Sequence, residues 1–186
     1  MTKEIKNLEQ QIKDWKEKHG GVFELPVDDK TCYLRIPGMP DYQRAFTAMQ
    51  DSGNSAFGEV MLEVLWLDGD KEIRTDNDYF TPAKKEVMKF LRYDDPIITD
   101  LPNRQKEIRI GDAVTVIRVI TKEDVTMAER KNPGDKPFVT QNALYDLVKI
   151  SADPVFDDKK NAAVRFPLFQ AMEKIQNEKV AQLKKL

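Results

Sequence analysis

Two stretches of the sequence decide the fold: VFELPVDDKTCYLRIP at residues 22–37 and EIRIGDAVTVIRVIT at residues 107–121. Each consists of two short runs of β-prone residues on either side of a polar turn, which is the pattern of a β-hairpin. Asp29 lies in the first turn, and Gly111 begins the second, where a leading glycine suits a tight hairpin turn. The sequence therefore predicts one hairpin in each half of the chain.

Each hairpin is followed by segments with helical periodicity. The predicted helices cover residues 41–50, 56–67 and 79–92 in the first half, and residues 122–132, 139–150 and 162 to the C-terminus in the second. The segment 56–67 is apolar nearly all round, which predicts a buried helix. Residues 93–106 hold two prolines and many polar residues, a composition typical of a linker.

The two halves align without gaps at a shift of 83 residues. At this shift YLRI lies on VIRV, so that Arg35 corresponds to Arg118, and Asp41 corresponds to Asp124. An exposed strand residue is one interpretation of each arginine, and an ion pair with a carboxylate of its own half is the other. The alignment itself indicates either a true duplication or a chance match between two charged sequences.

We predict an α+β fold with two related modules, each a β-hairpin followed by helices. An N-terminal helix covers residues 1–21, the first module residues 22–100, and the second residues 101–186. A module of this size buries a marginal core, which favours packing against a like neighbour. Self-association is therefore one expectation.

The N-terminal segment 2–19 is predicted to be an amphipathic helix that ends at Gly20-Gly21. Its apolar stripe consists of Ile5, Leu8, Ile12 and Trp15. The helix either packs on its own domain or binds a partner, and we predict partner binding through these four residues. Because it lies outside both modules, we expect it to pack on the second module or on a neighbouring copy more than on the hairpin that follows it.

Composition limits the classes of partner. The 30 basic and 32 acidic residues nearly cancel, so the chain lacks the basic excess typical of nucleic-acid binding. No apolar run approaches the ~20 residues of a membrane span. The chain has one cysteine, Cys32, and thus no internal disulfide. These features predict a cytoplasmic protein that binds neither nucleic acid nor a membrane.

The sequence shows no catalytic, cofactor-binding or metal-binding constellation. The single histidine, His19, ends a charged helix, where a cationic imidazole would complement the helix dipole. One cysteine and one histidine cannot fill a tetrahedral zinc site. The acidic stretch Asp68–Asp78 fails the EF-hand pattern, because Ile73 stands where glycine is required. We therefore predict a non-enzymatic protein, with a metal-dependent enzyme that uses Asp68–Asp78 as one alternative.

Residues 25–80 carry two phrases, Tyr33-Leu34-Arg35-Ile36-Pro37 and Trp66-Leu67-Asp68-Gly69-Asp70, the second followed by Ile73, Thr75 and Asp76. With the closing LKKL at 183–186, this segment resembles small phage tail-assembly chaperones. The resemblance covers about a third of the chain. The N-terminal helix and the second half depart from the family, and the repeat would account for the second half.

The resemblance implies a non-enzymatic role in virion assembly, in the cytoplasm of a bacterial host. Such proteins bind the tape-measure protein, keep its apolar helices soluble, and help to recruit tail-tube subunits. The alternative within virion assembly is a structural component, such as a head–tail connector or a tail-completion protein, which stays in the finished particle.

Overall fold

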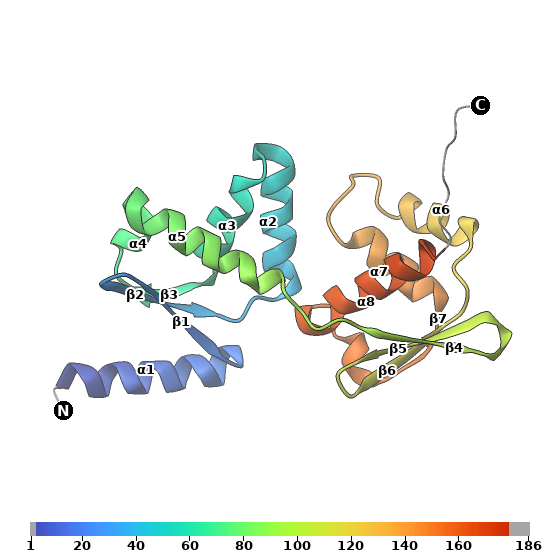
Figure 1. Cartoon of the computed structure of the whole chain (residues 1–186), viewed down its shortest axis with the longest axis horizontal. Coiled ribbons are helices and arrows are strands. Elements are labelled where there is room, and N and C mark those ends of the chain that lie inside the picture. The colour runs from blue at the N-terminus through green and yellow to red at the C-terminus, as the bar shows by residue number, and fades with distance from the viewer. Residues whose placement is uncertain (1–2, 179–186) are drawn as a thin grey trace. The chain divides into compact units, whose positions relative to one another are not determined.

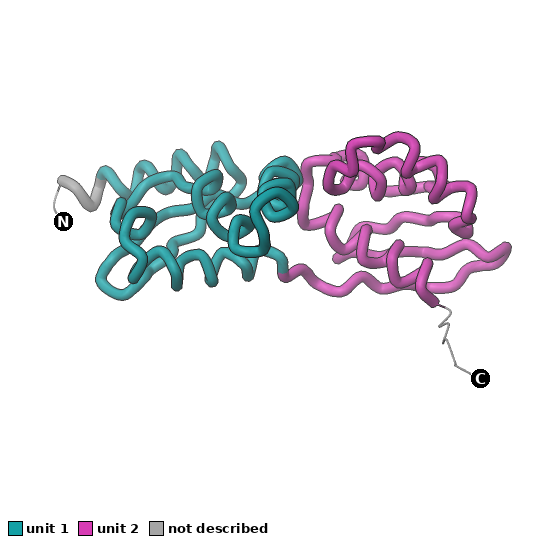
Figure 2. The backbone as a smooth tube through the Cα atoms, turned by 90° about the horizontal axis from the view of Figure 1, so that it is seen from above, with its two compact units in different colours: residues 1–91 teal, residues 92–186 magenta. Residues whose placement is uncertain are grey.

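The computed structural model describes the backbone of residues 3–178 and the side chains of residues 7–178. The chain divides into two compact units, Met1–Leu91 and Arg92–Leu186 (Figure 2). Each unit combines an antiparallel sheet with helices, so the predicted α+β class is confirmed (Figure 1). Among the described helices, none has the length and hydropathy that crossing a membrane requires.

Unit 1 contains a three-stranded sheet of order β1-β2-β3. Its elements are α1 (Lys3–His19), β1 (Val22–Val27), β2 (Lys30–Arg35), α2 (Met39–Ser52), α3 (Ser55–Leu65), β3 (Trp66–Gly69), α4 (Glu72–Thr75), α5 (Asn77–Val87) and a 3-10 turn (Met88–Leu91). Helices α2 to α5 lie on one face of the sheet and α1 lies on the other (Figure 1). The buried side chains of Cys32 and Leu34 point from β2 into the core under α2 to α5.

Unit 2 contains a four-stranded sheet of order β4-β5-β6-β7. Its elements are β4 (Ile97–Leu101), a 3-10 turn (Pro102–Arg104), β5 (Gln105–Ile110), β6 (Ala113–Ile117), α6 (Lys122–Arg130), α7 (Val139–Val148), β7 (Lys149–Ala152), a 3-10 turn (Pro154–Asp157) and α8 (Ala162–Gln176). The helices cover one face of this sheet (Figure 1). Ile108, Thr115 and Ile117 are buried beneath them.

The segment 93–106 is not the linker that its prolines suggested. Ile97–Leu101 forms β4, which pairs along its whole length with β5, and the prolines stand just outside the strand. The boundary between the units accordingly lies between Leu91 and Arg92, and the predicted boundary after residue 100 would cut through β4.

Sequence periodicity also missed the two short strands β3 and β7. Periodicity places residues 66–67 and 149–150 at the ends of helices, but the chain passes from α3 into β3 and from α7 into β7 without an intervening loop. Both strands are held by pairing with distant residues, β3 with β2 and β7 with β6. The predicted last helix ends at Gln176 within the described part of the chain, and the LKKL phrase lies outside it.

The two units repeat each other at the predicted shift of 83 residues. Cys32 pairs with Gly69 in unit 1, and the equivalent Thr115 pairs with Ala152 in unit 2. Both ladders then shift register at the same place, between Tyr33 and Leu34 and at the corresponding step in β6. A chance match would not reproduce a strand pairing and its bulge, so the repeat is structural.

The sequence alignment suggested a single shift without gaps, but this shift does not extend to the last helix. Pro82 in α5 corresponds to Pro167 in α8, and the buried Val87 corresponds to Met172, both 85 residues later. Two extra residues before α8 therefore lengthen the loop that precedes it in unit 2.

Candidate functional site: the outer sheet faces of the two units

In unit 1, an arginine side chain at the end of the hairpin joins β2 to the two helices that follow it; this arrangement is here called the arginine clamp. The guanidinium of Arg35 donates two hydrogen bonds of 2.7 Å to the carboxylate of Asp41 and one of 3.0 Å to the carbonyl of Val64. Asp41 also accepts the backbone N–H of Gly38 at 2.9 Å, which fixes the first turn of α2. One side chain thus ties the end of β2 to the start of α2 and the end of α3.

Unit 2 contains the same clamp 83 residues later. Arg118 donates to both carboxylate oxygens of Asp124 at 2.6 and 2.7 Å and to the carbonyl of Leu147 at 3.2 Å. Hydrogen bonds from Arg118 and from Thr121 hold the pKa of the buried Asp124 carboxyl well below its usual range. The ion-pair interpretation of the two arginines is therefore confirmed, and the clamps are structural.

The acidic stretch Asp68–Asp78 serves the local backbone in a similar way. Asp70 accepts the backbone N–H of Thr31 at 2.8 Å, and the equivalent Asp153 accepts that of Val114 at 2.7 Å. Asp76 caps α5 by accepting the N–H of Asp78. Within the described residues, no three carboxylate, histidine or cysteine side chains are grouped to hold a metal ion.

The side chain of Cys32 is buried and that of His19 is partly buried. Burial raises the pKa of the Cys32 thiol to about 12, so the thiol is protonated at neutral pH and is a poor nucleophile. Partial burial and the neighbouring Lys18 lower the pKa of His19, which favours a neutral imidazole. The expected cationic histidine at the end of α1 is thus not supported.

A pocket of about 590 Å³ lies between the β1–β2 turn and α5. Its lining consists of Pro26, Val27, Asp28, Asp78, Tyr79, Pro82 and Glu86. The buried side-chain atoms without a partner in the described part of the chain belong instead to Asn142 and Arg165 in unit 2. The pocket is acidic, because its lining includes the carboxylates of Asp28, Asp78 and Glu86, and we assign no ligand to it.

Helix α1 packs on its own hairpin, and the expectation that it packs mainly elsewhere is wrong. The indole of Trp15 lies 5.7 Å from the ring of Tyr33, which points away from the core side of β2. Leu8, Ile12 and Trp15 are each partly buried, and the side chain of Ile5 lies outside the described residues. Gly20, with φ of +74°, lets the chain turn back so that α1 crosses the sheet. Partner binding by this stripe stays a prediction.

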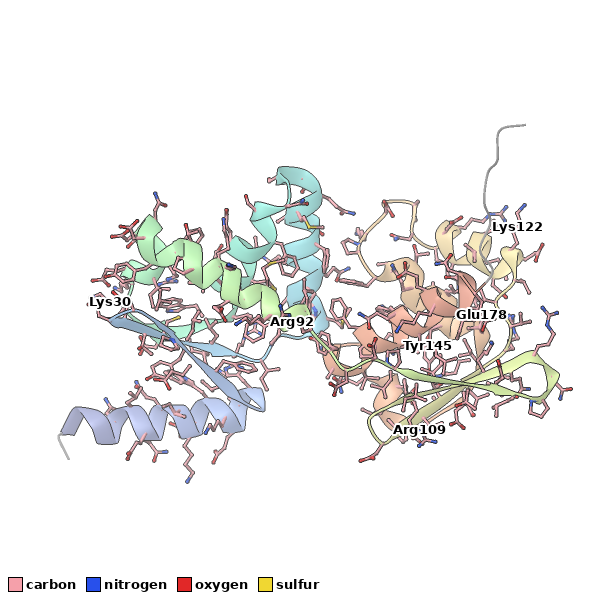
Figure 3. All side chains as sticks on the ribbon, viewed as in Figure 1. Lys30, Arg92, Arg109, Lys122, Tyr145 and Glu178 are labelled. Carbon is pink, nitrogen blue, oxygen red and sulfur yellow. The ribbon has the colours of Figure 1, made fainter. Side chains whose placement is uncertain are left out.

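On the corresponding face of unit 2, the described residues place no helix. Strand alternation places on this face the side chains of Ile97, Thr99, Glu107, Arg109, Val114 and Val116, here called the open face. Ile97 is 61% exposed, and Arg109 forms a 3.0 Å ion pair with Glu107. Figure 3 shows Arg109 on the side of the sheet away from the helices. Among the described elements of unit 2, none covers this face (Figure 1).

In the repeat, residues of the open face correspond to residues of the unit 1 sheet face that α1 covers. Val116 is the counterpart of Tyr33, and Val114 is the counterpart of Thr31. Sequence reasoning missed this face because it depends on which strand side the helices of unit 2 cover. One available signal was the run AVTVI, in which valines alternate with the inward residues.

No protein-family model matches the sequence, and neither the curated proteins nor the solved structures include a significant match to the chain.

Proposed function

We propose that the chain is a non-enzymatic protein that resembles a tail-assembly chaperone and holds apolar helices of a partner, such as a tape-measure protein, against its sheet surfaces. The observation that carries the proposal is α1 on unit 1, where an amphipathic helix covers a sheet face with its aromatic residue on Tyr33. A second copy of the same sheet lacks such a helix among the described residues.

The physical chemistry suits reversible binding. An amphipathic helix with no sheet or helix to cover its stripe exposes apolar surface, and covering that surface stabilises it by about 25 cal/mol per Å². One helix on a small sheet buries less area than a permanent interface, and part of the gain is lost to ordering. Such a protein would therefore shield a helix during assembly and release it afterwards, in the host cytoplasm and beside the tail-tube subunits.

The test is co-expression of the full chain with the tape-measure protein encoded in the same genome. We expect the soluble fraction of the tape-measure protein to rise several-fold, and the two proteins to elute together in size-exclusion chromatography. An unchanged soluble fraction would contradict the proposal.

Mass spectrometry of purified particles separates this function from a structural virion role. We expect the chain to be absent from finished particles, because a chaperone leaves once assembly is complete. Stoichiometric amounts in the particle would favour a head–tail connector or tail-completion protein.

A further inference from the structure

We infer that the open face of unit 2 is the docking surface for the partner helix, and that this helix has the chemistry of α1. It would be amphipathic, with apolar residues at three- and four-residue spacing and an aromatic side chain placed over Val116. This inference rests on the proposed function and assigns it to one surface.

The first step of the argument is the position. The hairpin and third strand of the two sheets pair in the same register and share the same bulge, so equivalent residues take equivalent positions on the two outer faces. In unit 1 that face holds a helix whose Trp15 contacts Tyr33. Placing a helix at the equivalent position in unit 2 brings the same part of the helix over Val116.

The second step is the chemistry of the surface. Valine stands at the position of Tyr33, and a second valine, Val114, stands at the position of Thr31, so the β6 part of the open face is aliphatic. The β5 part is more polar than in unit 1, because Gln105 and Arg109 stand at the positions of Val22 and Pro26. Val116 is also smaller than tyrosine, which leaves room for a bulky residue of the incoming helix. Strand β4, which has no counterpart in unit 1, adds the exposed Ile97 to the same face.

The third step is the charge. Glu107 and Arg109 are the charged residues of the open face, and they neutralise each other through their ion pair. A face without net charge selects a helix by its apolar stripe and not by its net charge. Binding should therefore depend weakly on salt, because no net charge on the face is available for screening.

The occupant is a partner helix and not α1. Within its own chain α1 is seated on unit 1 through Trp15. An α1 from a second copy would have to leave an equivalent seat to reach the open face. Self-association through exchange of α1 is therefore treated as a contrary outcome of the test.

The probe is a fluorescein-labelled peptide with the sequence of residues 2–19, titrated with the full chain and followed by fluorescence anisotropy. We expect Val116→Glu to weaken peptide binding at least tenfold, because it places a charge under the apolar stripe. Ile97→Glu should weaken binding as well, and its 61% exposure makes it harmless to the core. The matched control is Met127→Glu on α6, an exposed apolar residue off the face, which should leave affinity within twofold.

The same variants are tested with the tape-measure protein, so that the two proposals can fail separately. If Val116→Glu and Ile97→Glu still bind both the peptide and the tape-measure protein normally, the surface is wrong and the function stands. If the unsubstituted chain binds neither, the function fails. If light scattering shows a dimer that Ile97→Glu converts to a monomer, a second copy covers the face and the inference is overturned.

Discussion

Unit 1 and unit 2 share the strand pairing of their hairpin and third strand but differ in many side chains around it. In unit 1 the guanidinium of Arg74 lies 4.1 Å from the ring centre of Trp66, a cation–π contact. At the same two positions of unit 2, Asp157 and Lys149 form an ion pair of 3.1 Å. The two positions are thus in contact in both units, through a cation–π contact in unit 1 and an ion pair in unit 2.

The cores differ in the same manner. Cys32 and Leu62 are buried apolar residues in unit 1, and their counterparts in unit 2 are Thr115 and Tyr145. Because Thr115 donates to the carbonyl of Ser151 at 2.9 Å, the hydroxyl of Tyr145 donates to Thr115 at 2.8 Å. Burial raises the pKa of this Tyr145 hydroxyl. The comparison teaches that the clamp and strand pairing define the unit, and that interior side chains vary provided that polar groups are paired.

The segments before the two hairpins differ most. In unit 1 this segment is α1 on the outer face, and in unit 2 it is β4 at the sheet edge. The unit thus tolerates either arrangement, and within residues 3–178 the second leaves its outer face open.

The two units can be followed separately in the full chain. Both tryptophans, Trp15 and Trp66, lie in unit 1, so that tryptophan fluorescence reports on unit 1 while far-UV circular dichroism reports on both.

Gly69→Ala should have the largest effect. Gly69 has φ of +130°, and an added methyl would lie 2.5 Å from the carbonyl oxygen of Thr31 and closer still to the Cα of Cys32. We expect unit 1 to lose about 3 kcal/mol, from backbone strain and overpacking. The counterpart in unit 2 is already alanine, and Ala152→Gly should cost only about 0.5–1 kcal/mol. Urea unfolding followed by tryptophan fluorescence measures the first change; equal effects of the two substitutions would contradict the argument.

Arg118→Met should come second, because it leaves the Asp124 carboxylate buried without its cation. The side chain of Arg118 is 41% exposed and that of Asp124 3% exposed, so solvent screens part of the loss, and we expect about 2 kcal/mol. The matched Arg35→Met should cost less, since the Asp41 side chain is 14% exposed and can recover some hydration. The check is the urea midpoint by circular dichroism for Arg118→Met and by fluorescence for Arg35→Met. A larger loss for Arg35→Met would reverse the ranking of the clamps.

Thr115→Val should cost about 1–2 kcal/mol, because it leaves the buried hydroxyl of Tyr145 without its acceptor. Adding Tyr145→Phe removes that hydroxyl and makes the pair apolar, as it is in unit 1. We expect the double variant to be more stable than Thr115→Val alone, by thermal unfolding. If the second substitution lowers stability further, the unpaired hydroxyl is not the cause of the loss.

The smallest expected effect is on the pH dependence of stability in acid. Because the folded pKa of Asp124 is depressed, its contribution to stability is full above the unfolded value of about 4 and is lost as pH falls through the folded pKa. We expect Asp124→Asn to remove this part of the pH dependence below pH 4. The total fall in melting temperature on acidification should then be smaller by about 2–4 °C. The exposed Asp94→Asn is the control. Identical pH profiles for Asp124→Asn and the unsubstituted chain would exclude this role for the carboxylate.

The sequence by itself determined the elements whose signals are local. Alternation and a polar turn define each hairpin, and helical periodicity defines α2, α3, α6 and α7. The matched spacing of Arg35 with Asp41 and of Arg118 with Asp124 was enough to align the units, because the ion pair in each clamp joins residues only six positions apart.

Only the tertiary structure decided the features that depend on distant partners. A four-residue strand such as Trp66–Gly69 has no stability of its own and forms because β2 lies beside it. The strand β4 likewise depends on its pairing with β5, which no local composition encodes. Tertiary structure also decided which sheet face α1 covers and which face stays open. An amphipathic stripe shows that a helix will be covered but does not show by which surface.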